Sequence, residues 1–314
     1  MGEFVIMLRN VLMFVALAIP GYILVKGKLL KPEQSGVLSK LLMYVALPFM
    51  IFSGVVKNLT FDKDSLVMLG VVALIGIVAV MGMFFLSTPL VKMEKNRKTK
   101  GMMRFCAVFA NNGFLGIPLA VAVFGADSPV FTVLIVLNII NNVLMYTLGA
   151  YLTTGDKKNI SIKKAFLNPV LISFVLGCVC NLLGVAKYVP EVATFSNHFS
   201  NIVTPISMTV IGMKLGAVPM KSLFTSGKMY YVSFLKLILF PAVITAVLLA
   251  VKGISVDIIL GVFIAYATPT AGLAATFADE FNGDTENAVI FTLGTTVLSV
   301  LTIPTLYWVL NLFI

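Results

Sequence analysis

Residues 109–118 of the chain read Phe-Ala-Asn-Asn-Gly-Phe-Leu-Gly-Ile-Pro, and residues 265–272 read Ala-Tyr-Ala-Thr-Pro-Thr-Ala-Gly. Each stretch lies within an apolar run long enough to cross a membrane as a helix. Asn and Gly have poor helix propensity, and a proline in a helix interior removes a backbone hydrogen bond. Both stretches therefore predict a helix that breaks inside its apolar run. The residues expected to extend these breaks are Gly116, Pro118 and Gly272.

The composition around these stretches indicates an integral membrane protein. Of the 314 residues, 59% are hydrophobic and 11% are charged, and the mean hydropathy is +1.03. A soluble domain is about 45–50% apolar and about 25% charged. The apolar runs are roughly 18–25 residues long, which fits helices and not the alternating strands of a membrane barrel. We therefore expect an all-α polytopic membrane protein.

Ten apolar runs are candidate membrane spans, and the first is expected to be a span and not a signal peptide. The runs are 4–25, 37–56, 65–90, 102–124, 129–151, 168–186, 196–216, 229–251, 255–278 and 287–311. With the N-terminus outside, the inner loops hold 17 Lys and Arg residues and the outer loops five. Positive charge concentrates in cytoplasmic loops, so both termini are expected outside. The net charge of +10 is thereby explained by topology, and no nucleic-acid partner is expected.

A repeat is visible when the chain is compared with itself at an offset of 157 residues. Pro48 then falls on Pro205, and Asn112 falls on Pro269. Each half holds five expected spans, so the second half enters the membrane from the opposite side. This predicts two inverted five-helix repeats, residues 1–151 and 168–314, joined by a cytoplasmic linker at 152–167. Scaffold and transport domains would each combine parts of both repeats.

Inverted-repeat transporters bind substrate near the membrane midplane, where paired helices are interrupted. The expected substrate-binding residues lie in the two broken runs and in the spans beside them: Asn111, Asn112, Gly113, Thr268, Pro269, Thr270, Asn138, Asn142 and Lys236. Amides, hydroxyls and helix N-termini can bind a carboxylate without a formal counter-charge. Simple packing kinks are the alternative for the two breaks. Interhelical hydrogen bonding is the alternative for Asn138, Asn141 and Asn142, and snorkelling to the interface for Lys236 and Lys214. Ser299 and Thr302 are weaker candidates.

Residues 110–119 also resemble a known signature, that of the crossover helix in the auxin efflux carrier family, which includes bacterial malate and malonate permeases. Residues 46–52, 205–215 and 268–275 resemble further helices of that family. The resemblance implies ten helices, a scaffold and a core domain with two crossing broken helices, and a fold related to bile-acid/sodium symporters. It implies an elevator-like motion that moves organic anions. The short linker favours the bacterial type, in the cytoplasmic membrane of a bacterium, and elevator scaffolds often form homodimers.

The expected function is therefore that of a secondary transporter for a small organic anion such as malate or malonate, and not that of an enzyme. No cofactor or metal is expected, because one histidine and three scattered cysteines offer no constellation for either. The middles of the expected spans contain no Asp or Glu that could carry a proton, whereas Asn, Thr and backbone carbonyls could hold Na⁺. The coupling ion stays open between Na⁺, H⁺ and none. The alternatives are a sodium-coupled symporter of the bile-acid type and a membrane receptor or sensor that does not transport.

Overall fold

The structure, a computed structural model, describes residues 2–156, 158 and 160–314. Over these residues it is all-α, and the β pairing in this part of the chain is an isolated antiparallel bridge between Ala110 and Thr270. Positions 157 and 159 of the expected linker lie outside the described residues. The all-α class predicted from the apolar runs is confirmed.

The first half of the chain forms long helices, several of which contain a π-helical turn. Side chains cap three of the helices, because Asp62, Asn96 and Ser128 accept hydrogen bonds from the first backbone N–H groups of α4, α5 and α7. The elements are α1 (Gly2–Lys26), η1 (Pro32–Gln34), α2 (Ser35–Leu41), η2 (Leu42–Ala46), α3 (Leu47–Asn58), α4 (Lys63–Leu90), α5 (Arg97–Val108), η3 (Asn112–Gly116), α6 (Ile117–Phe124), α7 (Pro129–Leu144), η4 (Met145–Gly149) and α8 (Ala150–Thr154).

The second half repeats this alternation of long and short helices. Its elements are α9 (Ile162–Phe166), α10 (Pro169–Leu182), α11 (Val185–Tyr188), α12 (Glu191–Asn201), α13 (Val203–Ala217), α14 (Met220–Phe224), α15 (Gly227–Phe234), η6 (Leu235–Leu239), α16 (Phe240–Ala250), α17 (Val256–Ala267), α18 (Ala274–Glu280) and α19 (Thr285–Leu310). The expected run 196–216 is divided between α12 and α13. Pro205 causes this division, because its missing N–H would leave the carbonyl of Asn201 without a helical partner.

Within the part of the chain that the structure describes, six continuous helices are long and apolar enough to cross a membrane: Phe4–Lys26, Pro32–Asn58, Lys63–Leu90, Pro129–Thr154, Gly227–Ala250 and Thr285–Leu310. Shorter apolar helices accompany them, at Asn112–Phe124, Pro169–Leu182 and Val256–Ala267. Much of α4 faces outward, as expected of a helix in contact with lipid, and Leu74 and Phe85 are each 62% exposed. These six helices are fewer than the ten expected spans, because several of the expected runs are broken or form shorter helices.

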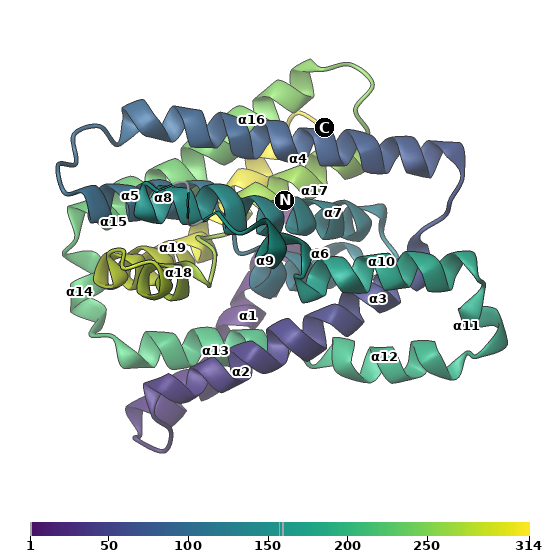
Figure 1. Cartoon of the computed structure of the whole chain (residues 1–314), viewed down its shortest axis with the longest axis horizontal. Coiled ribbons are helices and arrows are strands. Elements are labelled where there is room, and N and C mark those ends of the chain that lie inside the picture. Colours follow the sequence, from purple (N-terminus) through teal and green to yellow (C-terminus); the bar gives the residue numbers. More distant parts are fainter. Residues whose placement is uncertain (1, 157, 159) are drawn as a thin grey trace.

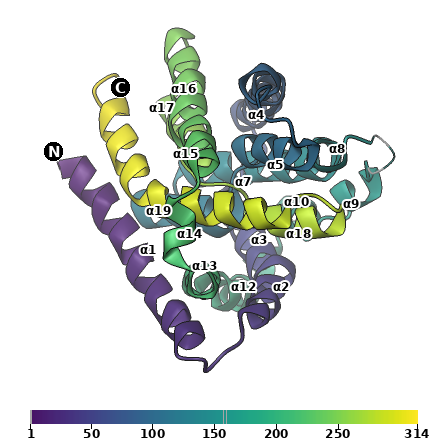
Figure 2. The same ribbon diagram turned by 90° about the vertical axis from the view of Figure 1, so that its left-hand side faces the viewer.

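Glycines allow the closest helix pairs to pack backbone to backbone. A Cβ on Gly212 of α13 would overlap the carbonyl oxygen of Ala18 in α1, and a Cβ on Gly21 would overlap the carbonyl oxygen of Thr209. Small residues at helix crossings are the usual means of association in a membrane. Figures 1 and 2 show α4 and α16 on one side of the molecule, and α2, α12 and α13 on the other. The helices that break, α5 and α17, lie between these two groups.

Candidate functional site

The two interrupted stretches meet and pair through their backbones. α5 ends at Val108 and α17 ends at Ala267. The N–H of Asn111 donates to the carbonyl of Pro269 at 2.8 Å, and the N–H of Ala271 donates to the carbonyl of Phe109 at 3.0 Å. Extended backbone at membrane depth is tolerated only where protein or a polar cavity satisfies its hydrogen bonds. Each break therefore provides hydrogen-bond partners for backbone groups of the other. We refer to these paired segments, residues 109–111 and 269–271, as the crossing.

Side chains from neighbouring helices satisfy further backbone groups of the crossing. The amide of Asn141 in α7 accepts from the N–H of Ala110 at 3.3 Å and donates to the carbonyl of Ala110 at 3.1 Å. The hydroxyl of Thr270 donates to the carbonyl of Cys106 at 2.8 Å, and the N–H of Thr270 donates to Oγ1 of Thr295 at 3.2 Å. A carboxamide can act at both ends because it carries a donor and an acceptor. Asn141 therefore acts as a clamp on the first break.

Two buried amide groups at the crossing keep free donors. The hydroxyl of Thr268 donates to Oδ1 of Asn112 at 3.2 Å and to the carbonyl of Ala265 at 3.0 Å. Nδ2 of Asn112 and Nδ2 of Asn138 are buried and have no hydrogen-bond partner among the described residues. An unpaired buried donor is costly, so such groups suit a ligand that accepts hydrogen bonds.

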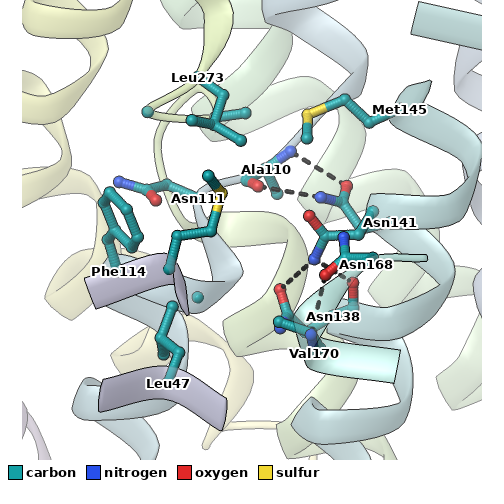
Figure 3. Close-up of a pocket in the computed structure, with 15 residues that line it drawn as sticks. Leu47, Ala110, Asn111, Phe114, Asn138, Asn141, Met145, Asn168, Val170 and Leu273 are labelled. Atoms are coloured by element: carbon teal, nitrogen blue, oxygen red, sulfur yellow. Dashed lines mark hydrogen bonds between the residues drawn. The ribbon is translucent and has the colours of Figure 1, made fainter. Parts of the chain in front are cut away.

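A small cavity of about 40 Å³ lies beside the crossing (Figure 3). Figure 3 shows Asn138, Asn141 and Asn168 together on one side and Asn111 with Phe114 on the other. The complete lining is Met43, Leu47, Ala110, Asn111, Gly113, Phe114, Asn138, Asn141, Asn142, Met145, Asn168, Val170, Ala271, Gly272 and Leu273. Five of these residues are asparagines and none is charged. We call this space the asparagine cavity.

Two helix N-termini contribute to the asparagine cavity. The helix Asn112–Phe124 begins there, and its residues Gly113 and Phe114 line the space. The helix α10 begins at Pro169, and Asn168 caps it by accepting from the N–H of Val170 at 2.9 Å. The first N–H groups of a helix carry a partial positive charge and lack intrahelical partners. The cavity therefore presents donors and positive potential without a formal charge, which suits an anion.

The lysines of the seventh and eighth expected spans, Lys214 and Lys236, bind carbonyl groups of the second break. Nζ of Lys214 donates to the carbonyl of Gly272 at 3.1 Å, and Nζ of Lys236 donates to the carbonyl of Tyr266 at 3.1 Å. Lys236 is fully buried, so its ammonium group does not reach the interface as the snorkelling alternative requires. Neither lysine lines the asparagine cavity. Lys236, which the sequence predicts as a substrate-binding residue, lies in η6 and binds the last turn of α17.

The expected site residues thus fall into distinct positions. Asn111, Gly113, Asn138, Asn142 and Gly272 line the asparagine cavity. Asn112, Thr268, Pro269 and Thr270 form hydrogen bonds at the crossing. Gly116 and Pro118 do not widen the break: they lie in the helix Asn112–Phe124, in and just after a π-helical turn. Such a turn accommodates the missing N–H of the proline.

Sequence reasoning missed Asn168 as a cavity residue. The Asn-Pro pair at 168–169 is a signal for a helix N-cap, and the structure shows that cap. The local sequence does not predict that the N-terminal end of α10 lies beside the crossing, because its position depends on how α10 packs against α3. Ser299, a weaker candidate, lines another cavity of about 150 Å³, which is otherwise mostly apolar.

Comparisons with known proteins agree with this architecture. Residues 6–307 match the family model described as membrane transport protein. An uncharacterized transporter of Methanothermobacter thermautotrophicus is 25% identical over 301 residues, which cover 94% of this chain and 96% of that protein. An uncharacterized transporter of Methanocaldococcus jannaschii is 25% identical over 313 residues, covering 96% of this chain and 97% of that protein. The chain therefore belongs to the membrane transport protein family, the auxin efflux carrier family, and is an integral membrane transporter.

Proposed function

We propose that this transporter moves a small organic anion, a carboxylate such as malate or malonate, by an elevator-type alternating-access mechanism. The observation that carries the proposal is the asparagine cavity, which offers amide donors and helix N-termini and contains no acidic side chain. A carboxylate has only acceptors when it is ionised, so it matches a site composed of donors. The free Nδ2 donor of Asn138, which lines the cavity, is the group we expect to bind the carboxylate directly.

The positive charges near the crossing support an anionic substrate. Lys214 binds the carbonyl of Gly272, which itself lines the asparagine cavity. Charge–charge interactions are strong where water is scarce, so a lysine one residue layer away raises the affinity for an anion. A cationic substrate would meet repulsion there and would find no carboxylate to offset it.

The asparagine cavity has to open further for any organic anion, and a small substrate requires the least opening. The cavity volume of about 40 Å³ is far below the roughly 300–1,000 Å³ of sites for larger ligands. A bile-acid-sized amphipathic anion would require a much larger opening than a short carboxylate. Helix movement is needed even for malate, which agrees with a transport cycle in which the site opens toward one side at a time.

We propose a membrane path of ten spans, arranged as two inverted five-helix repeats. Helices related by the 157-residue offset occupy corresponding places: α3 corresponds to α13, and α7 with its continuation corresponds to α19. The asparagine cavity and the mostly apolar cavity are also related, because Asn168, Gly272 and Asn142 of the first fall on Val11, Leu115 and Ser299 of the second. Each broken helix then counts as one span.

The repeat relation also extends to the helix pairs that would form the scaffold. α1 packs on α13, and the corresponding α10 packs on α3, where Gly177 lies against Val55. We propose that these four helices form the scaffold and that the helices around the crossing form the moving core. Both termini would lie outside the cytoplasmic membrane. The outward apolar face of α10, with Val175 and Val179 exposed, would face lipid or a second copy in a homodimer.

Uptake into liposomes tests the proposed function. The purified protein would be reconstituted and given labelled malate, with unlabelled malonate, succinate and a bile acid as competitors, under imposed Na⁺, pH and electrical gradients. We expect saturable malate uptake that malonate competes and the bile acid does not. Saturable binding without uptake under every gradient would contradict transport and support the receptor alternative. Competition by the bile acid alone would favour the bile-acid-type symporter.

A further inference from the structure

The last turn of α17 has a carbonyl group that its own helix leaves free. In a continuous helix the carbonyl of Tyr266 would accept a hydrogen bond from the N–H of Thr270. The break prevents this, because the N–H of Thr270 donates to Oγ1 of Thr295 at 3.2 Å. Nζ of Lys236 binds the carbonyl of Tyr266 in its place, at 3.1 Å. The C-terminal end of a helix carries partial negative charge, so an ammonium group is electrostatically favoured there.

We propose that the ammonium group of Lys236 is a tethered cation that stands where other transporters with broken helices hold a coupling Na⁺, so that this protein transports without Na⁺. In such transporters, unwound carbonyls and the C-terminal ends of half-helices coordinate the coupling ion. This inference rests on the proposed transport function, but it concerns a different position from the asparagine cavity. Lys236 is a positioning residue here, because it does not line that cavity.

The surroundings of Lys236 support this role. The side chain is 0% exposed and lies in the π-helical turn Leu235–Leu239 of the eighth expected span. Its neighbour Tyr266 is fixed in turn, because the Tyr266 hydroxyl donates to the carbonyl of Gly76 at 3.2 Å. A buried ammonium group without carbonyl oxygen around it would be strongly destabilising. The backbone of the second break is therefore the group that makes this lysine tolerable.

The two breaks differ in how their free carbonyls are satisfied. At the first break, the carbonyls of Cys106 and Ala110 accept from Thr270 and Asn141, which are neutral. At the second break, Lys236 and Lys214 each bind a carbonyl. The residue at the position of Lys236 in the first repeat is Ala79. Lysine side chains thus bind carbonyls at the second break and neutral side chains do so at the first; of the two lysines, Lys236 is the one that binds a carbonyl of the helix end itself.

Thermal unfolding in detergent tests this role without any need for a substrate. We would compare NaCl, KCl and choline chloride at equal ionic strength for the wild type, Lys236→Ala and the exposed-lysine control Lys252→Ala. We expect the wild type and the control to have the same Tm in all three salts. Lys236→Ala should have a Tm lower by about 5 °C in choline chloride, because it leaves a buried carbonyl unpaired. NaCl or ethylammonium chloride should restore part of that loss, since either cation can fill the vacated space.

If Lys236→Ala fails to fold, the Tm of the wild type in the three salts still tests the inference. A selective rise of the wild-type Tm in NaCl over KCl and choline chloride would show a separate Na⁺ site and overturn the inference. So would an unchanged Tm for both Lys236→Ala and the isosteric Lys236→Met. In liposomes, uptake that is equal in NaCl and choline chloride supports the inference, and uptake that requires Na⁺ overturns it. Absence of uptake in every condition would instead count against the proposed transport function.

Discussion

At the scale of single residues, Asn138, Asn141 and Asn142 of α7 have different hydrogen-bonding roles. Asn141 uses both ends of its amide on the backbone of Ala110, so it is occupied in holding the crossing together. Asn142 donates to the carbonyl and side-chain oxygen of Asn138, at 2.8 Å and 3.0 Å. Asn138 therefore keeps its own Nδ2 free. Asn141 thus fixes the backbone of the crossing, Asn142 orients the side chain of Asn138, and the Nδ2 group of Asn138 is available to a ligand.

Replacing Asn141 with Ala should destabilise the protein before it affects substrate affinity. The change leaves the N–H and carbonyl of Ala110 unpaired in a buried place, which costs about 1–3 kcal/mol. We expect the Tm in detergent to fall by roughly 3–8 °C on that basis. Asn10→Ala is the matched control, since Asn10 is a half-buried residue of α1 whose amide donates to the carbonyl of Ile6 in its own helix. Equal Tm values for the two variants would show that the clamp contributes nothing.

At the scale of helices, backbone contact between α1 and α13 sets how the two halves of the proposed scaffold meet. Both sides of this contact use glycine, and Gly216 of α13 adds a third close approach, to Tyr22 and Val25. Helix pairs in lipid gain little from the hydrophobic effect, so van der Waals packing must hold them together. A side chain inserted at this contact would separate the helices along much of their length.

Gly212→Ala should therefore destabilise the protein, whereas Gly70→Ala should not. The added methyl group at position 212 would overlap the carbonyl oxygen of Ala18, while a methyl group at position 70 would meet no atom within 4 Å. We expect a loss of about 1–3 kcal/mol for the first change and a neutral or slightly stabilising effect, up to about 1 kcal/mol, for the second. Thermal unfolding of both variants in one detergent measures the difference. A Gly212→Ala variant as stable as the wild type would show that the contact is looser than described.

The breaks were predictable at this scale, and other features of the helices were not. Asn, Gly, Thr and Pro at 111–113 and 268–270 disfavour the interior of a helix, and two or three of them in succession within an apolar run suffice to predict the interruptions. The π-helical turns at 42–46 and 235–239 each end two residues before a proline, Pro48 or Pro241, but a proline alone does not predict such a turn, because Pro20 lies inside α1 without one. Asn168 lines the asparagine cavity because of how its helix packs against its neighbours. Tertiary packing also directs the Lys236 side chain toward α17 and away from the membrane–water interface. Local propensity carries no information about such contacts.

At the scale of the whole molecule, the positive charges predict the orientation. Met93 is 88% exposed in the loop before α5, and Tyr188 is 82% exposed at the end of α11. The charge distribution places the first loop in the cytoplasm and the second outside. A background without Cys106, Cys178 and Cys180 would carry Met93→Cys or Tyr188→Cys. In intact cells a membrane-impermeant maleimide should label Tyr188→Cys and leave Met93→Cys unlabelled until the cells are lysed. The opposite pattern would invert the proposed topology.

The most direct test of the central claim, that the asparagine cavity is the transport site, is the initial rate of malate uptake into liposomes by Asn138→Ala and by Asn10→Ala. Each protein would first be shown to have the Tm of the wild type. A hydrogen bond to a charged group contributes about 1.5–3 kcal/mol, so we expect Asn138→Ala to lower kcat/KM for malate by roughly 10- to 100-fold. Asn10→Ala should transport like the wild type. Undiminished malate uptake by a folded Asn138→Ala protein would contradict the placement of the site.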